Sequence, residues 1–366
     1  MKIVHLSYAR INDFHDPHLW LKKISFYVGI LEAMAQHASV TSVHCISYEG
    51  TIEKNNVVYH FLKQTKWQHY FPLRLHRYLK SLKPDVILVH GLIFPWQVLQ
   101  LRWELGPLVK IVIQHHAERP FSDARKFIQM VVDSHISLYL FCAAEFGEEW
   151  LNGKQINDRS KIKEVMEASS SFLPMEKEKA KAFTKVSAGK IFLWVGRLDA
   201  NKDPLTLARA FSRFRHINPT AKLYMIFQST ELIAELQTII SDTKSDAVIN
   251  LVGKVEHDDL KYWYNSADFI VSTSHYEGSG IAVCEGLSCG CIPVLTNIPS
   301  FRMMTDRGLI GALFEAGNED SLIAAFVKAS RLDQDLQKKM VLEIFNNKLS
   351  FEAISKKILS DLNSIK

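Results

Sequence analysis

Short runs of apolar, mostly β-branched residues recur along the first part of the chain, and stretches with apolar residues at helical spacing separate them. The runs predict buried strands at residues 2–7, 40–47, 85–89, 109–114 and 136–142. The stretches between them predict helices, one over about 19–36 and another that begins near Pro95. Such alternation of strand and helix is typical of parallel sheets in an α/β fold.

The alternating pattern stops over residues 152–189. This segment holds an Asn-Gly pair, three consecutive serines and several lysines, a composition typical of a link between domains. A second series follows, with strands predicted at 191–196, 223–228, 248–252, 269–273 and 292–296 and helices at 204–215 and 258–265. We therefore expect two doubly wound, Rossmann-like domains that face each other across a cleft, the first over 1–175 and the second over 185–344. Ligands of such sheets bind at the carboxyl ends of the strands.

The size and composition agree with this organisation. A chain of 366 residues exceeds the usual size of one domain, and 47% hydrophobic and 23% charged residues are ordinary for a globular protein. The sequence has no run of ~18 apolar residues that predicts a membrane span, and its start reads as a strand and a polar loop rather than a signal peptide. The odd number of cysteines at irregular spacing predicts buried free thiols in a reducing cytoplasm, at Cys45, Cys142, Cys284, Cys289 and Cys291.

The net charge of +5 is mild, but residues 63–83 concentrate positive charge without any acid. Leucines at helical spacing predict an amphipathic helix in the second half of this segment. It is either a surface helix packed on the sheet or a patch that contacts anionic lipid headgroups. A nucleic-acid surface is the third interpretation, but no nucleic-acid-binding motif supports it, and we expect no nucleic-acid partner. The segment contains Lys63, Lys66, Trp67, Tyr70, Phe71, Arg74, Arg77, Tyr78, Lys80 and Lys83.

Residues 275–293, HYEGSGIAVCEGLSCGCIP, are the most informative segment of the chain. Gly278 and Gly280 permit a tight turn, and the apolar residues after it predict a short helix whose first N–H groups point into the turn, where a phosphate fits. The carboxylates of Glu277 and Glu285 would repel that phosphate, so they are better suited to accept hydrogen bonds from hydroxyls on either side of it. A molecule with hydroxyls on both sides of a diphosphate is a nucleotide sugar.

A second segment, WVGRLDANKDP at 194–204, supplies the cations that a diphosphate requires. Arg197 and Lys202 follow the end of a predicted strand, and Gly196 allows close approach of the backbone. An arginine binds two phosphate oxygens at once and a lysine adds a compact charge. The alternative is that both side chains are solvated residues of a loop that caps the next helix.

Together, GRLDANK at 196–202 and the E-x7-E pattern of Glu277 and Glu285 resemble the retaining family-4 glycosyltransferases of the GT-B fold. The flanking segments LVG at 251–253 and SCGCIPV at 288–294 agree with that family. The resemblance is close over about 190–316 and weaker, though compatible, over 1–150.

The resemblance implies a role for each matching residue. Arg197 and Lys202 would hold the donor diphosphate and stabilise the leaving group, Glu277 would bind hydroxyls of the transferred sugar, and Glu285 the ribose hydroxyls. His116, at the end of a strand of the first domain, would lie near the reacting sugar, whereas its neighbour His115 is better explained by packing. The last helix, about 345–366, would pack back on the first domain. The other donor-binding positions would be Gly196, Gly253, Lys254, Val255, Gly278, Ser279, Gly280 and Ile281.

One departure from the family concerns the loop after the first strand. Many members have a glycine pair there, whereas residues 7–20 read SYARINDFHDPHLW. Acceptor contacts therefore cannot be transferred to this loop, where Asp16 and His18 either line the cleft or cap the following helix.

Other motifs of nucleotide and metal enzymes are missing. Gly278-Ser-Gly280 fails the dinucleotide pattern because Val283 stands at its third glycine position, and the chain has no GxxxxGK[ST], no HExxH and no DxD in a strand-end loop. We therefore expect no cofactor and no metal, because cations and a helix dipole offset the diphosphate charge.

The sequence predicts a cytoplasmic, metal-independent retaining glycosyltransferase with a nucleotide-sugar donor and a sugar or lipid-linked acceptor. If residues 63–83 contact anionic lipid, the protein lies at the inner face of the membrane. Two alternatives stay open: a sugar-nucleotide epimerase or phosphorylase of the same fold, and a nucleotide-sugar-binding protein without catalytic activity.

Overall fold

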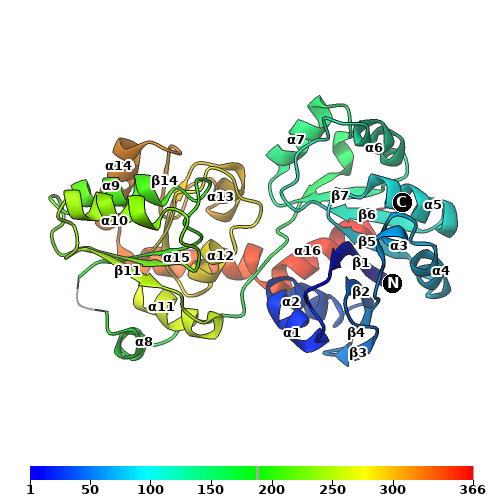
Figure 1. The fold of residues 1–366 in the computed structure, drawn as a ribbon, viewed down its shortest axis with the longest axis horizontal. Helices are drawn as coiled ribbons and strands as arrows, with labels where there is room; N and C mark the ends of the chain where they lie inside the picture. The colour runs from blue at the N-terminus through cyan, green and yellow to red at the C-terminus, as the bar shows by residue number, and fades with distance from the viewer. Residues whose placement is uncertain (187–188, 366) are drawn as a thin grey trace. The chain divides into compact units, whose positions relative to one another are not determined.

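The computed structural model describes residues 1–186 and 189–365, which divide into two compact units (Figure 1). Unit 1 comprises Met1–Ser169 together with the last helix, α16 (Phe351–Asn363), and unit 2 comprises Ser170–Ser350. The chain thus passes between the units after Ser169 and again after Ser350, whereas the limits predicted from the sequence are 175, 185 and 344.

Unit 1 is built on an eight-stranded sheet in the order β3-β4-β2-β1-β5-β6-β7-β8. All its pairings are parallel except β3–β4. The chain order reverses direction between β1 and β5, as it does in doubly wound folds. The strands are β1 (Lys2–Ile11), β2 (Ser39–Ile46), β3 (Gly50–Lys54), β4 (Val57–Phe61), β5 (Val86–His90), β6 (Lys110–Gln114), β7 (Leu138–Phe141) and β8 (Ile162–Glu164).

The helices of unit 1 differ from the prediction at the first one. The single helix expected over 19–36 is wrong: the structure has two helices, and the chain turns between them at Ile24. The first begins at Pro17, because the Asp16 carboxylate accepts hydrogen bonds from the N–H groups of His18 and Leu19. The helices are α1 (Pro17–Lys23), α2 (Ser25–Met34), α3 (Lys66–Tyr70), α4 (Leu73–Ser81), α5 (Pro95–Leu105), α6 (Arg125–Asp133) and α7 (Ala144–Asn152), with one tighter turn, η1 (Arg159–Lys161).

The hairpin of β3 and β4 is also absent from the prediction. Asn55 and Asn56 form its two-residue turn and both adopt the left-handed conformation, with φ of 48° and 64°. Asparagine tolerates this conformation, and such turns match the twist of an antiparallel pair. Residues 152–189, which were predicted to be a link between domains, also contain regular structure: the strand β8 and a helix, α8 (Lys177–Thr184).

Unit 2 contains a six-stranded, fully parallel sheet in the order β11-β10-β9-β12-β13-β14. Its chain order reverses between β9 and β12, so the carboxyl ends of these two neighbouring strands mark the expected ligand position. The strands are β9 (Ile191–Val195), β10 (Lys222–Ile226), β11 (Ile249–Gly253), β12 (Phe269–Ser272), β13 (Ile292–Thr296) and β14 (Ala312–Phe314). The helices are α8, α9 (Pro204–Phe214), α10 (Ile233–Asp242), α11 (Leu260–Ser266), α12 (Ile281–Ser288), α13 (Pro299–Met304), α14 (Glu319–Arg331) and α15 (Gln334–Ile344), with a short 3₁₀-helix, η2 (His257–Asp259), and a π-helix, η3 (Phe345–Leu349).

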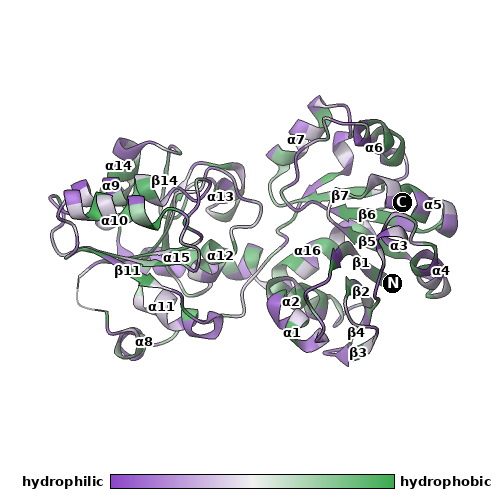
Figure 2. Ribbon diagram, in the orientation of Figure 1, coloured by the Kyte–Doolittle hydropathy of each residue, from purple (hydrophilic) through white to green (hydrophobic). Residues whose placement is uncertain are grey.

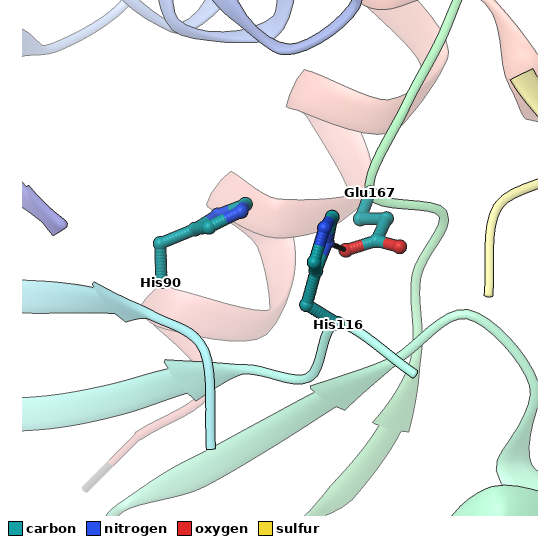
Figure 3. A group of neighbouring side chains, drawn as sticks. All are labelled: His90, His116 and Glu167. Carbon is teal, nitrogen blue, oxygen red and sulfur yellow. Dashed lines mark hydrogen bonds and ion pairs between the residues drawn. The ribbon is translucent and has the colours of Figure 1, made fainter. Parts of the chain in front are cut away.

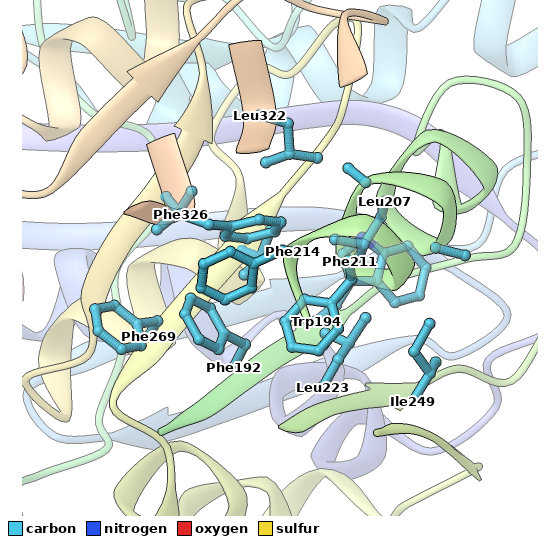
Figure 4. Close-up of a cluster of buried hydrophobic side chains, with 14 of the residues drawn as sticks. Phe192, Trp194, Leu207, Phe211, Phe214, Leu223, Ile249, Phe269, Leu322 and Phe326 are labelled. Carbon is cyan, nitrogen blue, oxygen red and sulfur yellow. The ribbon is translucent and has the colours of Figure 1, made fainter. Parts of the chain in front are cut away.

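Aromatic side chains fill the core of unit 2 between the sheet and helices α9 and α14 (Figure 4). The rings of Phe192 on β9 and Phe269 on β12 stack with centroids 4.4 Å apart. Phe211 and Phe326 meet Phe192 edge-on from the two helices. The hydropathy of the residues agrees with this packing. The strands of both units are mainly hydrophobic, whereas the helices carry both hydrophobic and hydrophilic residues (Figure 2). This packing holds β9 and β12, and therefore the loops that follow them, in fixed register.

Two further expectations concern the whole chain. Within the residues that the structure describes, no helix combines the length and the apolar character needed to cross a membrane. All five cysteines are buried and free, as predicted.

Candidate functional site

The loops that follow β9 and β12 are joined to each other at the carboxyl edge of the unit 2 sheet. Lys202 Nζ forms an ion pair with Glu277 Oε1 across the two loops. Asn201 Nδ2 donates to the carbonyl of Tyr276 (3.0 Å), and Thr273 Oγ1 donates to the carbonyl of Lys202 (2.6 Å). Residues 75 positions apart in the chain therefore form one structural element at the point where the strand order reverses.

Arg197 and Lys202, the two cations of the loop after β9, differ in their exposure to solvent. Lys202 and Glu277 are largely shielded, with side chains 23% and 13% exposed. Arg197 is 67% exposed and pairs through Nε with Asp199 Oδ2 at 2.9 Å. Gly196, just before it, donates its N–H to the carbonyl of Ile226 on β10 (3.1 Å). The structure thus brings Lys202 and Glu277 together and leaves the guanidinium of Arg197 open to solvent.

Gly280 is the cap residue just before helix α12 and adopts the left-handed conformation with φ of 54°. A Cβ atom at this position would lie 2.7 Å from Cε1 of Phe301, so both the backbone and the available space require glycine. The helix packs closely on β12, since a side chain at Gly286 would meet Ile270 at 2.9 Å. The first N–H groups of an α-helix have no intrahelical partner and attract anions, so the turn of Gly278, Ser279, Gly280 and Ile281 can receive a phosphate or a hydroxyl oxygen.

Glu285 lies inside α12 and is only 5% exposed. Both of its carboxylate oxygens are engaged: Oε1 with Nε2 of His257 (2.6 Å) and Oε2 with the hydroxyl of Tyr264 (2.8 Å). Burial and the nearby Glu285 charge raise the pKa of the Tyr264 hydroxyl, which therefore stays a donor. His257 is half-exposed, so the Oε1 side of Glu285 is the side that a ligand can reach.

Sequence reasoning missed His257 and Tyr264. The signal was present in the pattern, because His257 lies between β11 and α11, and Tyr264 lies within α11, the helix that packs against α12. The predicted positions of the same loop, Gly253, Lys254 and Val255, lie at the carboxyl end of β11, where Gly253 has φ of 82° and Lys254 pairs with an exposed glutamate (3.2 Å).

His116 belongs to unit 1, where it follows β6 (Figure 3). Its Nδ1 is hydrogen-bonded to Oε2 of Glu167, a carboxylate that is 1% exposed. This bond raises the pKa of His116 to about 9, against the opposing effect of burial. The ring of His90, at the end of the neighbouring strand β5, lies 5.0 Å away, and burial lowers its pKa to about 3. His115 points instead into the core, where its Nε2 is bonded to the carbonyl of Glu118 (2.7 Å).

The three side chains of Figure 3 also have the chemistry of a metal-binding group. Ligand atoms of His90, His116 and Glu167 lie within 4.8 Å of one another. Of these three residues, only His116 was predicted from the sequence, because neither His90 nor Glu167 belongs to a recognisable motif. We therefore regard these three residues as a second candidate site, which belongs to unit 1.

Comparison with known proteins finds sequence relatives mainly for the second half of this chain. Residues 175–343 match the family model of "Glycosyl transferases group 1". A D-inositol 3-phosphate glycosyltransferase from Arthrobacter sp. (strain FB24) is 28% identical over 148 residues, which are 39% of this chain and 35% of that protein. A poly(glycerol-phosphate) alpha-glucosyltransferase from Bacillus subtilis (strain 168) is 32% identical over 146 residues, 39% of this chain and 21% of that protein.

The fold comparison extends over the whole chain. A crystal structure of a glycosyltransferase from Rickettsia africae ESF-5 matches with a TM-score of 0.75 and 14% identity, covering 100% of this chain and 98% of that one. The chain therefore has the GT-B fold, with two Rossmann-like units. The sequence matches to the curated relatives, by contrast, span only about a third or less of the lengths of those relatives.

Proposed function

We propose that this protein is a retaining glycosyltransferase that transfers a sugar from a nucleotide-diphosphate sugar to a hydroxyl of an acceptor. The observation that carries the proposal is the Lys202–Glu277 ion pair at the reversal point of the unit 2 sheet, next to the N-terminus of α12. A cation that can bind phosphate, Lys202, lies there beside a carboxylate that can accept hydrogen bonds from hydroxyls, Glu277. A sugar diphosphate requires both kinds of group.

Each part of the site has a role in donor binding. Arg197, Lys202 and the N–H groups at the start of α12 offset the charge of the diphosphate, so the donor needs no metal ion. Glu277 accepts hydrogen bonds from the transferred sugar, and Glu285 accepts them from the ribose. The segment from Gly253 to Val255 contacts the base.

The proposed reaction keeps the configuration at the anomeric carbon. The bond from that carbon to the diphosphate oxygen breaks as the acceptor oxygen attacks on the same face, through an oxocarbenium-like state. The leaving phosphate oxygen takes the proton of the acceptor hydroxyl. Lys202 and Arg197 stabilise the negative charge that develops on the diphosphate, an effect that contributes only as the bond breaks.

The acceptor is proposed to be a sugar or lipid-linked molecule used in cell-envelope polysaccharide or glycolipid synthesis. Supporting this, α3 and the residue that follows it, Phe71, expose aromatic side chains among basic ones, with Trp67 75% exposed. A row of rings continues from Phe71 through Trp96 to Trp103 on α5, with centroids 6.3 Å and 6.2 Å apart. Exposed aromatic and basic residues on one surface favour contact with anionic headgroups.

Vesicle flotation tests the membrane contact. We expect binding to phosphatidylcholine vesicles that contain phosphatidylglycerol, weakened by salt and by Trp67→Ala, and no binding to phosphatidylcholine alone. Leu336→Ala removes a residue 54% exposed on α15 of unit 2 and is the matched control. Salt-independent binding, or none, would make residues 63–83 an ordinary surface.

A thermal-shift panel of UDP, GDP, ADP and their sugars tests the donor site. We expect one nucleotide and its sugar to raise the unfolding temperature of the protein, because a ligand that binds the folded state stabilises it, and Lys202→Ala to abolish the rise. No shift with any nucleotide would contradict the proposal. Product analysis then separates the alternatives: an epimerase converts donor alone, a phosphorylase uses free phosphate, and a non-catalytic protein binds donor without turnover across an acceptor screen.

A further inference from the structure

The carboxyl edge of the unit 1 sheet brings two imidazole rings and one carboxylate together (Figure 3). His90 is the last residue of β5, His116 follows the neighbouring strand β6 by two positions, and Glu167 follows β8 by three. One possible ligand atom from each residue lies within 4.8 Å of those of the other two. The group is therefore assembled from three strand ends, and it belongs entirely to unit 1.

The chemistry of this group favours a transition metal over a hard cation. Imidazole nitrogens suit zinc and the other metals of the first transition series, whereas magnesium and calcium prefer oxygen ligands. Two histidines and one carboxylate are the protein ligands of one class of zinc site, which keeps its fourth position for water. The side chain of His116 is 46% exposed, so an ion and its water can reach the group from solvent.

The carboxylate of Glu167 is buried, and the site gives it one hydrogen-bond partner of its own. Its side chain is 1% exposed, and Nδ1 of His116 is bonded to its Oε2. A buried carboxylate is costly unless donors or a cation compensate it. A divalent ion between the carboxylate and the ring compensates it more fully than this single hydrogen bond.

The ring of His90 is held in place but is free to bind a ligand. Tyr27 meets it edge-on at 4.6 Å between centroids, and His5 meets it edge-on at 5.6 Å. Neither ring nitrogen of His90 is hydrogen-bonded to a residue that the structure describes, and its Nδ1 is shielded from solvent. Buried polar atoms normally have a partner, so this ring can give a nitrogen to a metal ion without breaking an existing bond.

The backbone on which His116 stands is tied to the strand end of His90. The carboxylate of Glu118 accepts hydrogen bonds from the N–H of His116 (2.5 Å) and from the N–H of Leu92 in the loop after β5 (2.9 Å). The two loops that carry the histidines therefore keep a fixed separation. Metal sites need such support, because ligands must be oriented before the ion binds.

We propose that His90, His116 and Glu167 bind one divalent transition-metal ion of the zinc type, with water at the remaining position. Zinc bonds to nitrogen and oxygen are ~2.0–2.2 Å long, so tetrahedral geometry places the ligand atoms ~3.3 Å apart. Because the three atoms already lie within 4.8 Å, side-chain rotations close the site without movement of the strands. Binding exchanges the hydrogen bond between His116 and Glu167 for two bonds to the ion, and the proton of that hydrogen bond passes to solvent. The site concerns unit 1 alone and does not depend on the proposed donor site of unit 2.

Titration of the protein with Zn²⁺, after treatment with a chelator and without any nucleotide, tests the proposal. We expect calorimetry to show one equivalent bound with sub-micromolar affinity. Bound Zn²⁺ should also raise the unfolding temperature, because only the folded chain brings the three ligands together. Co²⁺ in place of Zn²⁺ should give the visible absorption bands of an ion held by side chains, which the hydrated ion does not show at comparable strength.

Glu167→Gln and His116→Gln each remove one ligand. We expect each to weaken Zn²⁺ binding ~100-fold or more, because even a residue that only orients a metal ligand contributes ~10- to 100-fold to the affinity. His37→Gln is the matched control, since His37 is an exposed histidine of the same unit, and it should leave the affinity unchanged. Thermal unfolding without metal shows whether each variant is folded. The half-exposed ring of His116 makes His116→Gln the variant that decides if the buried Glu167→Gln does not fold.

Three results would overturn the proposal. The first is that the unsubstituted protein binds no Zn²⁺ at micromolar concentration. The second is that folded His116→Gln binds Zn²⁺ as tightly as the unsubstituted protein, because the ion would then be held elsewhere, for example by cysteines. The third is binding that requires a nucleotide, since the ion would then belong to the bound nucleotide. Loss of binding in His116→Gln but not in His37→Gln supports the site.

Discussion

At the scale of single residues, the site of unit 2 consists of charges that are already paired in the free protein. Lys202 forms an ion pair with Glu277, and His257 and Tyr264 form hydrogen bonds with the two carboxylate oxygens of Glu285. Such pairing holds the carboxylates in fixed directions without a ligand. Under the proposed function, the donor exchanges one set of partners for another, so its hydroxyls and phosphates must match the directions that these residues already fix.

Removal of either member of the Lys202–Glu277 pair is the most direct test at this scale. We expect Lys202→Ala and Glu277→Ala each to lower the transfer rate ~10²-fold or more, because each removes a group that stabilises charge in the transition state. Lys348→Ala breaks an ion pair of 2.7 Å between Lys348 and Asp306 on the surface of the same unit and should change the rate less than ~2-fold. Steady-state kinetics with the donor identified by thermal shift measure all three, and a folded variant with near-native turnover would exclude that residue from the site.

At the scale of elements, helix α12 depends on packing more than on helix propensity. It has eight residues, six of which are buried, and a glycine in its interior that lets it approach β12. An isolated helix of this length is unstable in water. Its start is therefore set by its contacts, and Gly280 is the residue at which the contact and the backbone conformation coincide.

Gly280→Ala tests this dependence. We expect a loss of ~1–3 kcal/mol in the free energy of unfolding of unit 2, since the left-handed backbone is unfavourable for alanine and the added carbon meets Phe301 at 2.7 Å. Gly308→Ala shares the left-handed backbone, with φ of 85°, but meets Leu313 only at an ordinary 3.4 Å, so it should cost less. Urea unfolding gives the two values. Equal losses would mean that the approach to Phe301 has no effect on stability.

At the scale of the whole molecule, unit 1 is formed by two separate parts of the sequence, and unit 2 is formed by the residues between them. Helix α16 comes last in sequence yet packs on α2 of unit 1, where the ring of Phe351 covers Gly29. Unit 1 is therefore complete only when both ends of the chain are present. The units also differ in their histidines, since His5, His44, His76 and His115 are buried in unit 1, whereas the described histidines of unit 2, His216, His257 and His275, are exposed.

This difference predicts that acid destabilises unit 1 first. Burial lowers the pKa of His44 to about 3 and of His76 to about 4, so these rings are neutral in the folded protein but gain a proton on unfolding below pH ~6.5. Their contribution to stability is complete above pH ~6.5 and is lost as the pH falls toward 3. His116 has the opposite sign, because its raised pKa adds stability that is lost as the pH rises through about 9.

Pulsed hydrogen exchange at increasing urea concentration, read separately in β1 and β5 and in β9 and β12, measures both units in one sample. We expect the midpoint for unit 1 to fall more steeply than that of unit 2 between pH 6.5 and pH 4.5. Parallel decline of the two midpoints would contradict the assignment of acid sensitivity to the buried histidines.

The periodic pattern predicted most strands because strands of a parallel sheet are buried on both faces and read as continuous apolar runs. It failed where a local feature decides the structure, as at the Asn55–Asn56 turn of the β3–β4 hairpin and at the break between α1 and α2. The first strand also runs on to Ile11, past the predicted end, because Tyr8 is buried there and bonded to His76. No spacing rule foretells such a contact.

The sequence by itself determined the α/β class, the two series of strands and the residue types of one candidate site, because hydrophobic periodicity and short motifs are local properties of the chain. Tertiary structure decided which groups meet. The Lys202–Glu277 pair, the contacts of Glu285 with His257 and Tyr264, and the His116–Glu167 pair each join segments that are far apart in the chain. The order of strands in each sheet sets those meetings, and that order arises from the packing of the whole unit.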